Sequence, residues 1–251
     1  MLEVRNLSKS FGGVAAIDDV TLSFPTGSLS AIIGPNGAGK STFFNLITGW
    51  FKPDRGRVLL EGSDIVGLPA PEIVRRGIGR AFQVASIFHS LTVEEALLAA
   101  VTAHHRRSGV MSRRFPLPET RQRASDVAAL LSLSDKRHML SANLSHGDQK
   151  LLDIALALVL EPTVLLLDEP TAGMGPDERW RMIEKVYELW ERQKLTLVFI
   201  EHDMDIVFKI ASTIRVLCYG RVLAEGTPDE IRANPAVIEA YLGVPVEEAA
   251  E

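Results

Sequence analysis

The fold of this chain is decided by one short stretch, Gly34-Pro35-Asn36-Gly37-Ala38-Gly39-Lys40-Ser41. It matches the phosphate-loop pattern G-x-x-x-x-G-K-[ST], in which glycines let backbone N–H groups approach phosphate oxygens at the start of a helix. The lysine adds a positive charge, and the serine hydroxyl is a ligand for Mg²⁺. The alternative is a glycine-rich turn that only opens a helix. It is disfavoured because an apolar strand precedes the loop and a helical pattern follows it.

Short apolar strands and amphipathic helices alternate along the rest of the chain. The clearest strands are predicted over residues 29–33, 163–167, 196–200, 213–219 and 222–225. Helices are predicted over residues 40–48, 204–211 and 176–194, the last with Trp180, Ile183, Tyr187 and Trp190 on one apolar stripe. This alternation predicts an α/β fold with a mainly parallel sheet and flanking helices.

Two regions depart from the alternating pattern. Residues 2–7, 17–24 and 57–60 lie between Gly and Pro turns and predict an N-terminal antiparallel β subdomain. From about residue 92 strand character disappears, and the sequence Thr92-Val93-Glu94-Glu95 predicts a capping box that opens a helix. We therefore expect a single domain over residues 1–243, with a helical subdomain over about 92–160 inserted in it, and an acidic tail over 244–251.

Composition excludes several classes of protein. The 251 residues contain 27 Lys and Arg against 32 Asp and Glu, so no overall basic field attracts nucleic acid, and we expect no nucleic-acid partner. The single cysteine, Cys218, excludes disulfide frameworks and favours a reduced, cytosolic compartment, with the thiol packed in the core. We find no secretory signal, and no apolar stretch approaches the ~18 residues that span a bilayer.

A pair of carboxylates follows the apolar run of residues 164–167. Asp168 stands at the predicted strand end, where it is suited to hold Mg²⁺ through water. Glu169 points differently and is suited to act as general base on the attacking water. The alternative, two acidic residues that only cap a strand, is disfavoured beside a phosphate loop.

A third stretch, Leu144-Ser145-His146-Gly147-Asp148-Gln149, resembles the LSGGQ signature of the ATP-binding cassette (ABC) ATPases. Ser145 is expected to N-cap a helix that runs to residue 160, where its hydroxyl and the free amides form an anion site. A plain capping box of Ser145 and Asp148 is the alternative. His146 replaces the first glycine of the signature. Asp148 places a negative charge near the phosphate, so we expect it to disfavour the ATP-bound dimer.

Other motifs of the same family appear in order along the chain. Gln83 resembles the Q-loop glutamine that reaches Mg²⁺ and the attacking water, and His202 resembles the switch histidine that contacts the γ-phosphate. Phe11 resembles the aromatic residue that stacks on adenine, with core packing as its alternative. Residues 171–176 occupy the position of the D-loop, where Gly175 replaces the Asp of many members.

The resemblance implies an ABC ATPase core of the phosphate-loop NTPase type, with ATP and Mg²⁺ as cofactors. The implied catalytic residues are Glu169, His202 and Gln83. The implied nucleotide contacts are Phe11, Gly34, Asn36, Gly37, Ala38, Gly39, Lys40, Ser41 and Thr42. The implied metal-side residues are Ser41, Gln83 and Asp168. The signature residues Ser145, His146, Gly147 and Asp148 would contact ATP held by a second cassette.

Within the family, three segments resemble the ATP-binding subunits of importers for branched-chain amino acids and related amides. They are residues 2–4 together with 11–13, residues 75–83, and residues 172–176. Cassettes of lipopolysaccharide-type exporters are similar in the same places and remain an alternative. The resemblance implies permease subunits as partners, a second identical or different cassette, and a position on the cytoplasmic face of the inner membrane.

A soluble nucleotide switch acting on ribosomes or DNA is the rival class. Soluble members of the translation type usually carry two cassettes in one chain, and repair-type members have a long coiled coil between two ATPase halves. Neither feature occurs in these 251 residues, so transport is favoured. The basic run between His104 and Arg123 is interpreted as a solvated loop between helices.

Overall fold

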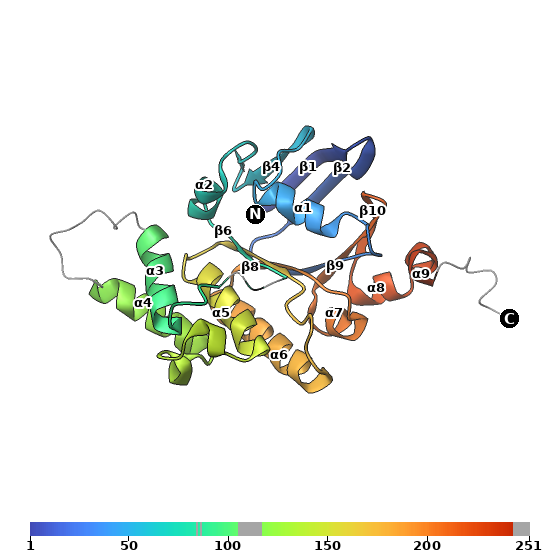
Figure 1. Cartoon of the computed structure of the whole chain (residues 1–251). Helices are drawn as coiled ribbons and strands as arrows, with labels where there is room; N and C mark the ends of the chain where they lie inside the picture. The colour runs from blue at the N-terminus through green and yellow to red at the C-terminus, as the bar shows by residue number, and fades with distance from the viewer. Residues whose placement is uncertain (84, 86, 105–116, 243–251) are drawn as a thin grey trace. The chain divides into compact units, whose positions relative to one another are not determined.

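The computed structural model describes residues 1–83, 85, 87–104 and 117–242 (Figure 1). The chain divides into two compact units. The first unit contains residues 1–73 and the chain from residue 195 onward, and the second contains residues 74–194. The expected acidic tail and most of the basic run, including Arg106, Arg107, Arg113 and Arg114, lie outside the described residues. The expected limits of the helical subdomain remain a prediction.

The N-terminal strands of the first unit form an antiparallel sheet. It contains β1 (Leu2–Phe11), β2 (Val14–Phe24), β4 (Arg55–Leu60) and β5 (Ser63–Asp64), in the order β2-β1-β4-β5. The strands β1 and β2 extend further than predicted, because Gly12 and Gly13 connect them in a two-residue hairpin with positive φ at both positions (53° and 87°). The antiparallel subdomain is therefore confirmed.

The first unit also contains the strands that surround the phosphate loop. They are β3 (Leu29–Ile33), β8 (Thr196–Ile200), β9 (Thr213–Cys218) and β10 (Arg221–Gly226), in the order β10-β9-β3-β8, with only β10 antiparallel. All residues of β3 and β8 are buried, which is typical of parallel strands covered on both faces. The helices are α1 (Lys40–Ile47), α7 (Met204–Ile210), α8 (Pro228–Arg232) and α9 (Pro235–Leu242), and α2 (Ala70–Arg75) lies at the unit boundary.

The second unit is mostly helical. The parallel strands β6 (Ile78–Ala81) and β7 (Val164–Asp168) accompany α3 (Val93–His104), α4 (Pro118–Leu130), α5 (His146–Leu158) and α6 (Pro176–Gln193). Two 3₁₀ turns, η2 (Ser134–Lys136) and η3 (Ser141–Asn143), precede α5. The capping box of α3 is confirmed, because the Thr92 amide donates to Glu95 Oε2 (2.8 Å) and the Glu95 amide donates to Thr92 Oγ1 (3.3 Å). The strand β6 was not predicted.

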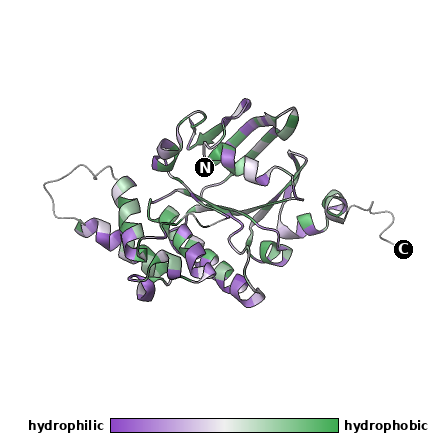
Figure 2. Cartoon of the chain, viewed as in Figure 1, coloured by the Kyte–Doolittle hydropathy of each residue, from purple (hydrophilic) through white to green (hydrophobic). Residues whose placement is uncertain are grey.

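The buried face of α6 differs from the predicted aromatic stripe. Its buried residues are Met182, Ile183, Val186 and Leu189, whereas Tyr187 is 39% exposed. Figure 2 shows hydrophilic and hydrophobic segments mixed along this helix. The prediction was wrong because the aliphatic residues, also spaced three or four apart, fill the core, while the larger rings of Tyr187 and Trp190 pack against each other at its border (5.5 Å between centroids).

The environment of Cys218 and the apolar character of the helices bear on two further expectations. Cys218 is only half-buried, because it is the last residue of β9. The prediction that its thiol packs in the core was therefore wrong. Among the described helices, none combines the length and the apolar character that a membrane crossing requires. The expected α/β fold, with a parallel sheet, flanking helices and an antiparallel N-terminal part, is confirmed.

Candidate functional site

The phosphate loop connects β3 to α1 in the first unit. Gly39 has φ 101°, and a Cβ at that position would collide with the Ala16 carbonyl, so the loop requires glycine there. Lys40 is 7% exposed, and its ammonium donates to the carbonyls of Gly34 (2.7 Å) and Pro35 (3.0 Å). Asn36, Gly37 and Ser41 are exposed. The loop therefore presents backbone and hydroxyl groups at its surface around a buried, charged lysine.

Segments far along the chain hold this loop in place. The Gly220 amide donates to the Ala38 carbonyl (3.1 Å), and a Cβ on Gly34 would collide with the Leu217 carbonyl. Tyr241 of α9 contacts Gly34. Burial raises the pKa of the Tyr241 hydroxyl to about 12, although the hydrogen bond from the Gly34 backbone lowers this pKa. The sequence argument missed this support, because the pairing depends on how the C-terminal helix folds back.

The two other predicted residues of the first unit are exposed. Phe11 is 41% exposed and meets Phe51 edge to face (5.1 Å between centroids), so it is not a core residue. An exposed ring is what base stacking requires. His202 follows β8 and is exposed, while its amide donates to Oε2 of the buried Glu201 (3.2 Å). Both observations are compatible with the roles predicted for Phe11 and His202.

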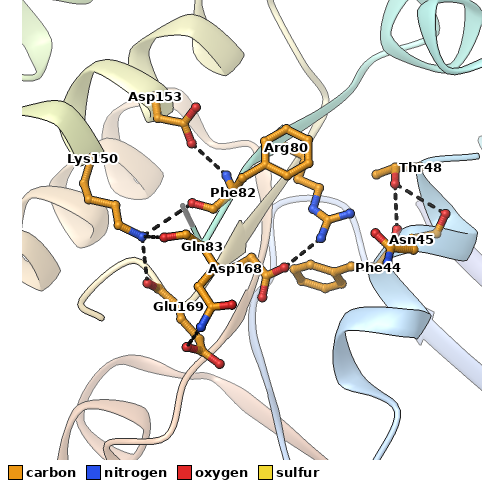
Figure 3. A network of polar contacts seen from close by, with 10 residues as sticks. All are labelled: Phe44, Asn45, Thr48, Arg80, Phe82, Gln83, Lys150, Asp153, Asp168 and Glu169. Atoms are coloured by element: carbon orange, nitrogen blue, oxygen red, sulfur yellow. Dashed lines mark hydrogen bonds and ion pairs between the residues drawn. The ribbon is translucent and has the colours of Figure 1, made fainter. Parts of the chain in front are cut away.

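Asp168 ends β7 in the second unit and forms a buried ion pair. Its Oδ2 accepts from Arg80 Nη2 at 2.7 Å, and the two side chains are only 6% and 8% exposed (Figure 3). The pair forms because β6 and β7 are parallel neighbours, in the register Ala81 with Leu167. Asp168 Oδ1 is buried, and no described residue forms a hydrogen bond with it. Sequence reasoning missed Arg80, because β6 was not recognised as the strand beside Asp168.

Glu169 and Gln83, both singled out in the sequence, lie in contact in the second unit. Gln83 follows β6, and its Nε2 donates to Glu169 Oε2 at 2.5 Å (Figure 3). Glu169 has φ 49°, a left-handed conformation that is uncommon for a residue with a side chain. This conformation directs its carboxylate differently from that of Asp168. The two carboxylates are therefore available for different tasks.

The signature helix α5 supports the Gln83 loop through two polar residues that sequence reasoning missed. Lys150 is 2% exposed, and its ammonium donates to the carbonyls of Phe82 (3.4 Å), Gln83 and Glu169 (3.4 Å). Asp153 Oδ2 accepts from the Phe82 amide at 2.7 Å (Figure 3). Both residues stand in an otherwise apolar helical run, and that was the available signal, because a buried charge requires a partner.

The start of α5 is capped as predicted, but Asp148 is not an uncompensated charge. The Asp148 amide donates to Ser145 Oγ (3.2 Å), and Ser145 Oγ donates to Asp148 Oδ2 (2.6 Å). Lys136 Nζ lies 2.7 Å from both carboxylate oxygens. Burial raises the pKa of Asp148, but the bonds from Lys136 and Ser145 outweigh it and hold this pKa below its ordinary value. The expected effect of Asp148 on the ATP-bound dimer stays a prediction, but η2 brings Lys136 to the carboxylate and reduces the charge that would repel a phosphate.

His146 connects the signature to the predicted D-loop of the same unit. Its Nε2 lies 3.1 Å from the Ala172 carbonyl, and a Cβ on Gly173 would come within 3.2 Å of the same nitrogen. The imidazole thus occupies space beside a glycine of the loop. The replacement of the first signature glycine by histidine creates a contact that a glycine cannot make.

The chain is similar to known transport proteins. The family model described as "ABC transporter" matches residues 17–172, and the one described as "Branched-chain amino acid ATP-binding cassette transporter" matches residues 221–247. The "High-affinity branched-chain amino acid transport ATP-binding protein LivG" of Escherichia coli (strain K12) is 39% identical, over 97% of this chain and 98% of that protein. The corresponding protein BraF of Pseudomonas aeruginosa is 38% identical, with the same coverage.

Solved structures agree with these relatives. An ATP-binding cassette of an ABC transporter in its ADP conformation has a TM-score of 0.85 at 33% identity, over 97% of this chain and 99% of that one. A dimeric bacterial ABC transporter cassette has a TM-score of 0.76 at 26% identity, over 91% and 99%. The fold expected from the resemblance is therefore confirmed.

Proposed function

The chain belongs to the ABC transporter family, whose ATP-binding cassettes hydrolyse ATP, and from this premise we propose that it powers a membrane importer of branched-chain amino acids or related amides. The observation that carries the cargo class is the match of residues 221–247 to the branched-chain family model. This segment follows the part of the chain that matches the general ABC model. The identity to LivG along nearly the whole chain supports the same cargo class.

The phosphate loop would bind the β- and γ-phosphates of ATP. Lys40 already lies against the loop carbonyls and needs only to turn its ammonium toward phosphate oxygens. The exposed backbone of Asn36 and Gly37 and the start of α1 supply N–H donors, and the half-buried Thr42 follows Ser41 in the first turn. The exposed ring of Phe11 is suited to stack on adenine.

The residues proposed on the Mg²⁺ side are Ser41 in the first unit and Asp168 and Gln83 in the second, and each carries an oxygen that Mg²⁺ can bind. The supporting observation is the buried Asp168 Oδ1, for which the described part of the chain offers no hydrogen-bond partner, because hard cations prefer oxygen ligands. Bound Mg²⁺ would neutralise charge that develops on the phosphates. Arg80 keeps the other oxygen of Asp168 in a defined position, so the carboxylate does not rotate freely.

Glu169 is proposed as the general base and His202 as a phosphate contact. The Gln83 amide donates to Glu169 Oε2 and so orients the carboxylate that would accept a proton from the attacking water. Lys150 fixes the backbone of both Gln83 and Glu169, so the two side chains move together with α5. The signature at the start of α5 would contact the ATP of a second cassette, identical to this chain or different.

The proposed assembly places two cassettes under permease subunits, peripheral on the cytoplasmic face of the membrane. The test is purification of the native membrane complex through this chain, followed by uptake of leucine and of urea into vesicles energised with ATP. ATP-dependent leucine uptake supports the proposal, and urea uptake alone would shift the cargo to amides. A chain that binds no membrane protein would contradict the transport function.

The Glu169→Gln variant tests the chemistry within that complex. We expect it to keep ATP binding and to lose ~10²–10⁴-fold in hydrolysis, because an amide does not accept the proton. Glu161→Gln is the matched control, since Glu161 is 60% exposed and pairs only loosely with Arg123 (3.5 Å). Normal turnover in Glu169→Gln would exclude the role of Glu169 as the base.

A further inference from the structure

The hydroxyl of Ser145 is engaged within its own helix turn. It has one proton, which it donates to Asp148 Oδ2 at 2.6 Å. Phosphate oxygens near neutral pH act mainly as hydrogen-bond acceptors, so Ser145 can bind a phosphate of ATP only by turning this proton away from Asp148. That rotation removes one donor from a carboxylate that is only 16% exposed. The signature serine and the signature aspartate therefore compete for one proton.

Lys136 resolves this competition. Its ammonium lies 2.7 Å from Oδ1 and 2.7 Å from Oδ2, so each oxygen keeps a charge-assisted bond when Ser145 turns away. The lysine also neutralises Asp148, which otherwise stands with its charge beside the phosphate position at the start of α5. One side chain thus frees the hydroxyl and removes the repulsion.

The lysine is held in place by its own turn. The Lys136 amide donates to the Leu133 carbonyl (3.1 Å), and the Lys136 carbonyl accepts from the Met139 amide (2.8 Å). The next residue, Arg137, accepts from the Glu94 amide at the start of α3 (3.0 Å). Lys136 lines a cavity of about 350 Å³ together with Ser145, Asp148 and the α6 cations Arg181 and Lys185. The ammonium is thus positioned before any ligand arrives.

We propose that Lys136 is a positioning residue for the contact between the signature and the terminal phosphate of ATP held by a second cassette. It acts through Asp148 and Ser145 and does not itself touch the nucleotide. The inference rests on the proposed function, since it requires a signature that acts on the ATP of a partner. It explains how a signature with an aspartate at this position keeps a phosphate-binding hydroxyl.

The experiment measures ATP-dependent dimerisation of the full chain in the Glu169→Gln background by sedimentation velocity. Lys136→Met is expected to weaken the ATP dimer about tenfold, because the Asp148 carboxylate then repels the phosphate without a compensating cation. ATP affinity of the monomer, set by its own phosphate loop, should not change. Lys136→Arg should retain most of the dimer affinity, because it keeps the positive charge.

Two further variants separate positioning from simple structural support. Lys185→Met is the matched control: Lys185 lines the same cavity, but it donates to Ser132 Oγ (2.9 Å). It should leave dimerisation unchanged. Adding Asp148→Asn to Lys136→Met should restore the dimer, since no charge then needs neutralising. A loss that persists in this double variant would mean that Lys136 only supports the fold, and the proposal would be overturned.

The outcomes also distinguish the proposed contact with a second cassette from the role of Lys136 in that contact. A Glu169→Gln chain that stays monomeric with ATP would refute the contact in trans, and the Lys136 inference would fall with it. A parent that dimerises, together with a Lys136→Met variant that dimerises equally well, would overturn the role of Lys136 alone and leave the proposed function intact.

Discussion

The buried ion pair of Arg80 and Asp168 allows a quantitative prediction of how much the fold loses in stability when the partner of a buried carboxylate is removed. Arg80→Met removes the guanidinium but keeps a long apolar side chain, so Asp168 stays buried without its cation. The two side chains are 8% and 6% exposed, with 2.7 Å between Nη2 and Oδ2. Unit charges about 3 Å apart attract by ~5–6 kcal/mol at an effective dielectric constant of about 20, against ~1.4 kcal/mol in bulk water.

The cost of desolvating the two charges offsets much of this attraction when both partners are present. When Arg80 is removed, the desolvation cost of Asp168 remains but the attraction is lost. Breaking a buried pair from one side typically costs ~3–5 kcal/mol in the free energy of unfolding. For a chain of this length, each 1 kcal/mol corresponds to about 2–4 °C, so Arg80→Met should lower the Tm by roughly 6–20 °C. Thermal unfolding followed by circular dichroism measures the shift.

A matched pair in the same chain supplies the control. Arg221 Nη2 lies 2.7 Å from Asp18 Oδ2, but these side chains are 72% and 31% exposed. Arg221→Met should therefore cost less than ~1 kcal/mol. The double variant Arg80→Met with Asp168→Leu should recover most of the lost stability, because no buried charge remains. Equal shifts for Arg80→Met and Arg221→Met would refute the reasoning from burial.

Three further outcomes are expected. Lys40→Ala should weaken ATP affinity in a nucleotide titration, because a charge-assisted phosphate contact is lost; an unchanged titration would count against this loop. Lys150→Met should lower kcat ~10–100-fold with little change in ATP affinity, since it releases the carbonyls of Gln83 and Glu169. Because the pKa of Asp148 is lowered in the folded state, its carboxylate stabilises the fold at pH values above about 3.9, and this stability is lost as the pH falls through the lowered pKa. Asp148→Asn should therefore make the stability depend less on pH in an acid unfolding experiment followed by fluorescence.

Local sequence determined the parts of this protein whose physical cause is local. The phosphate loop, the strands β3 and β8, and the cap of α3 were predictable, because glycine φ angles, apolar runs and capping side chains act over a few residues. The succession of motifs then pointed to the family. The succession singled out both Gln83 and Glu169, but the contact between them, across 86 positions, was seen only in the structure.

Only the tertiary structure decided which charges are compensated. Arg80 is 88 positions from Asp168, Lys150 is 67 positions from Gln83, and Lys136 is 12 positions from Asp148 across a 3₁₀ turn. The hydrophobic periodicity of the sequence does not predict such pairs, because strand register and helix packing determine which residue lies beside a buried charge. The aromatic stripe of α6 failed for the same reason, since several faces of a helix are apolar and the neighbouring elements choose between them. The sequence shows the charge of Asp148, but only the folded structure shows that Lys136 neutralises it.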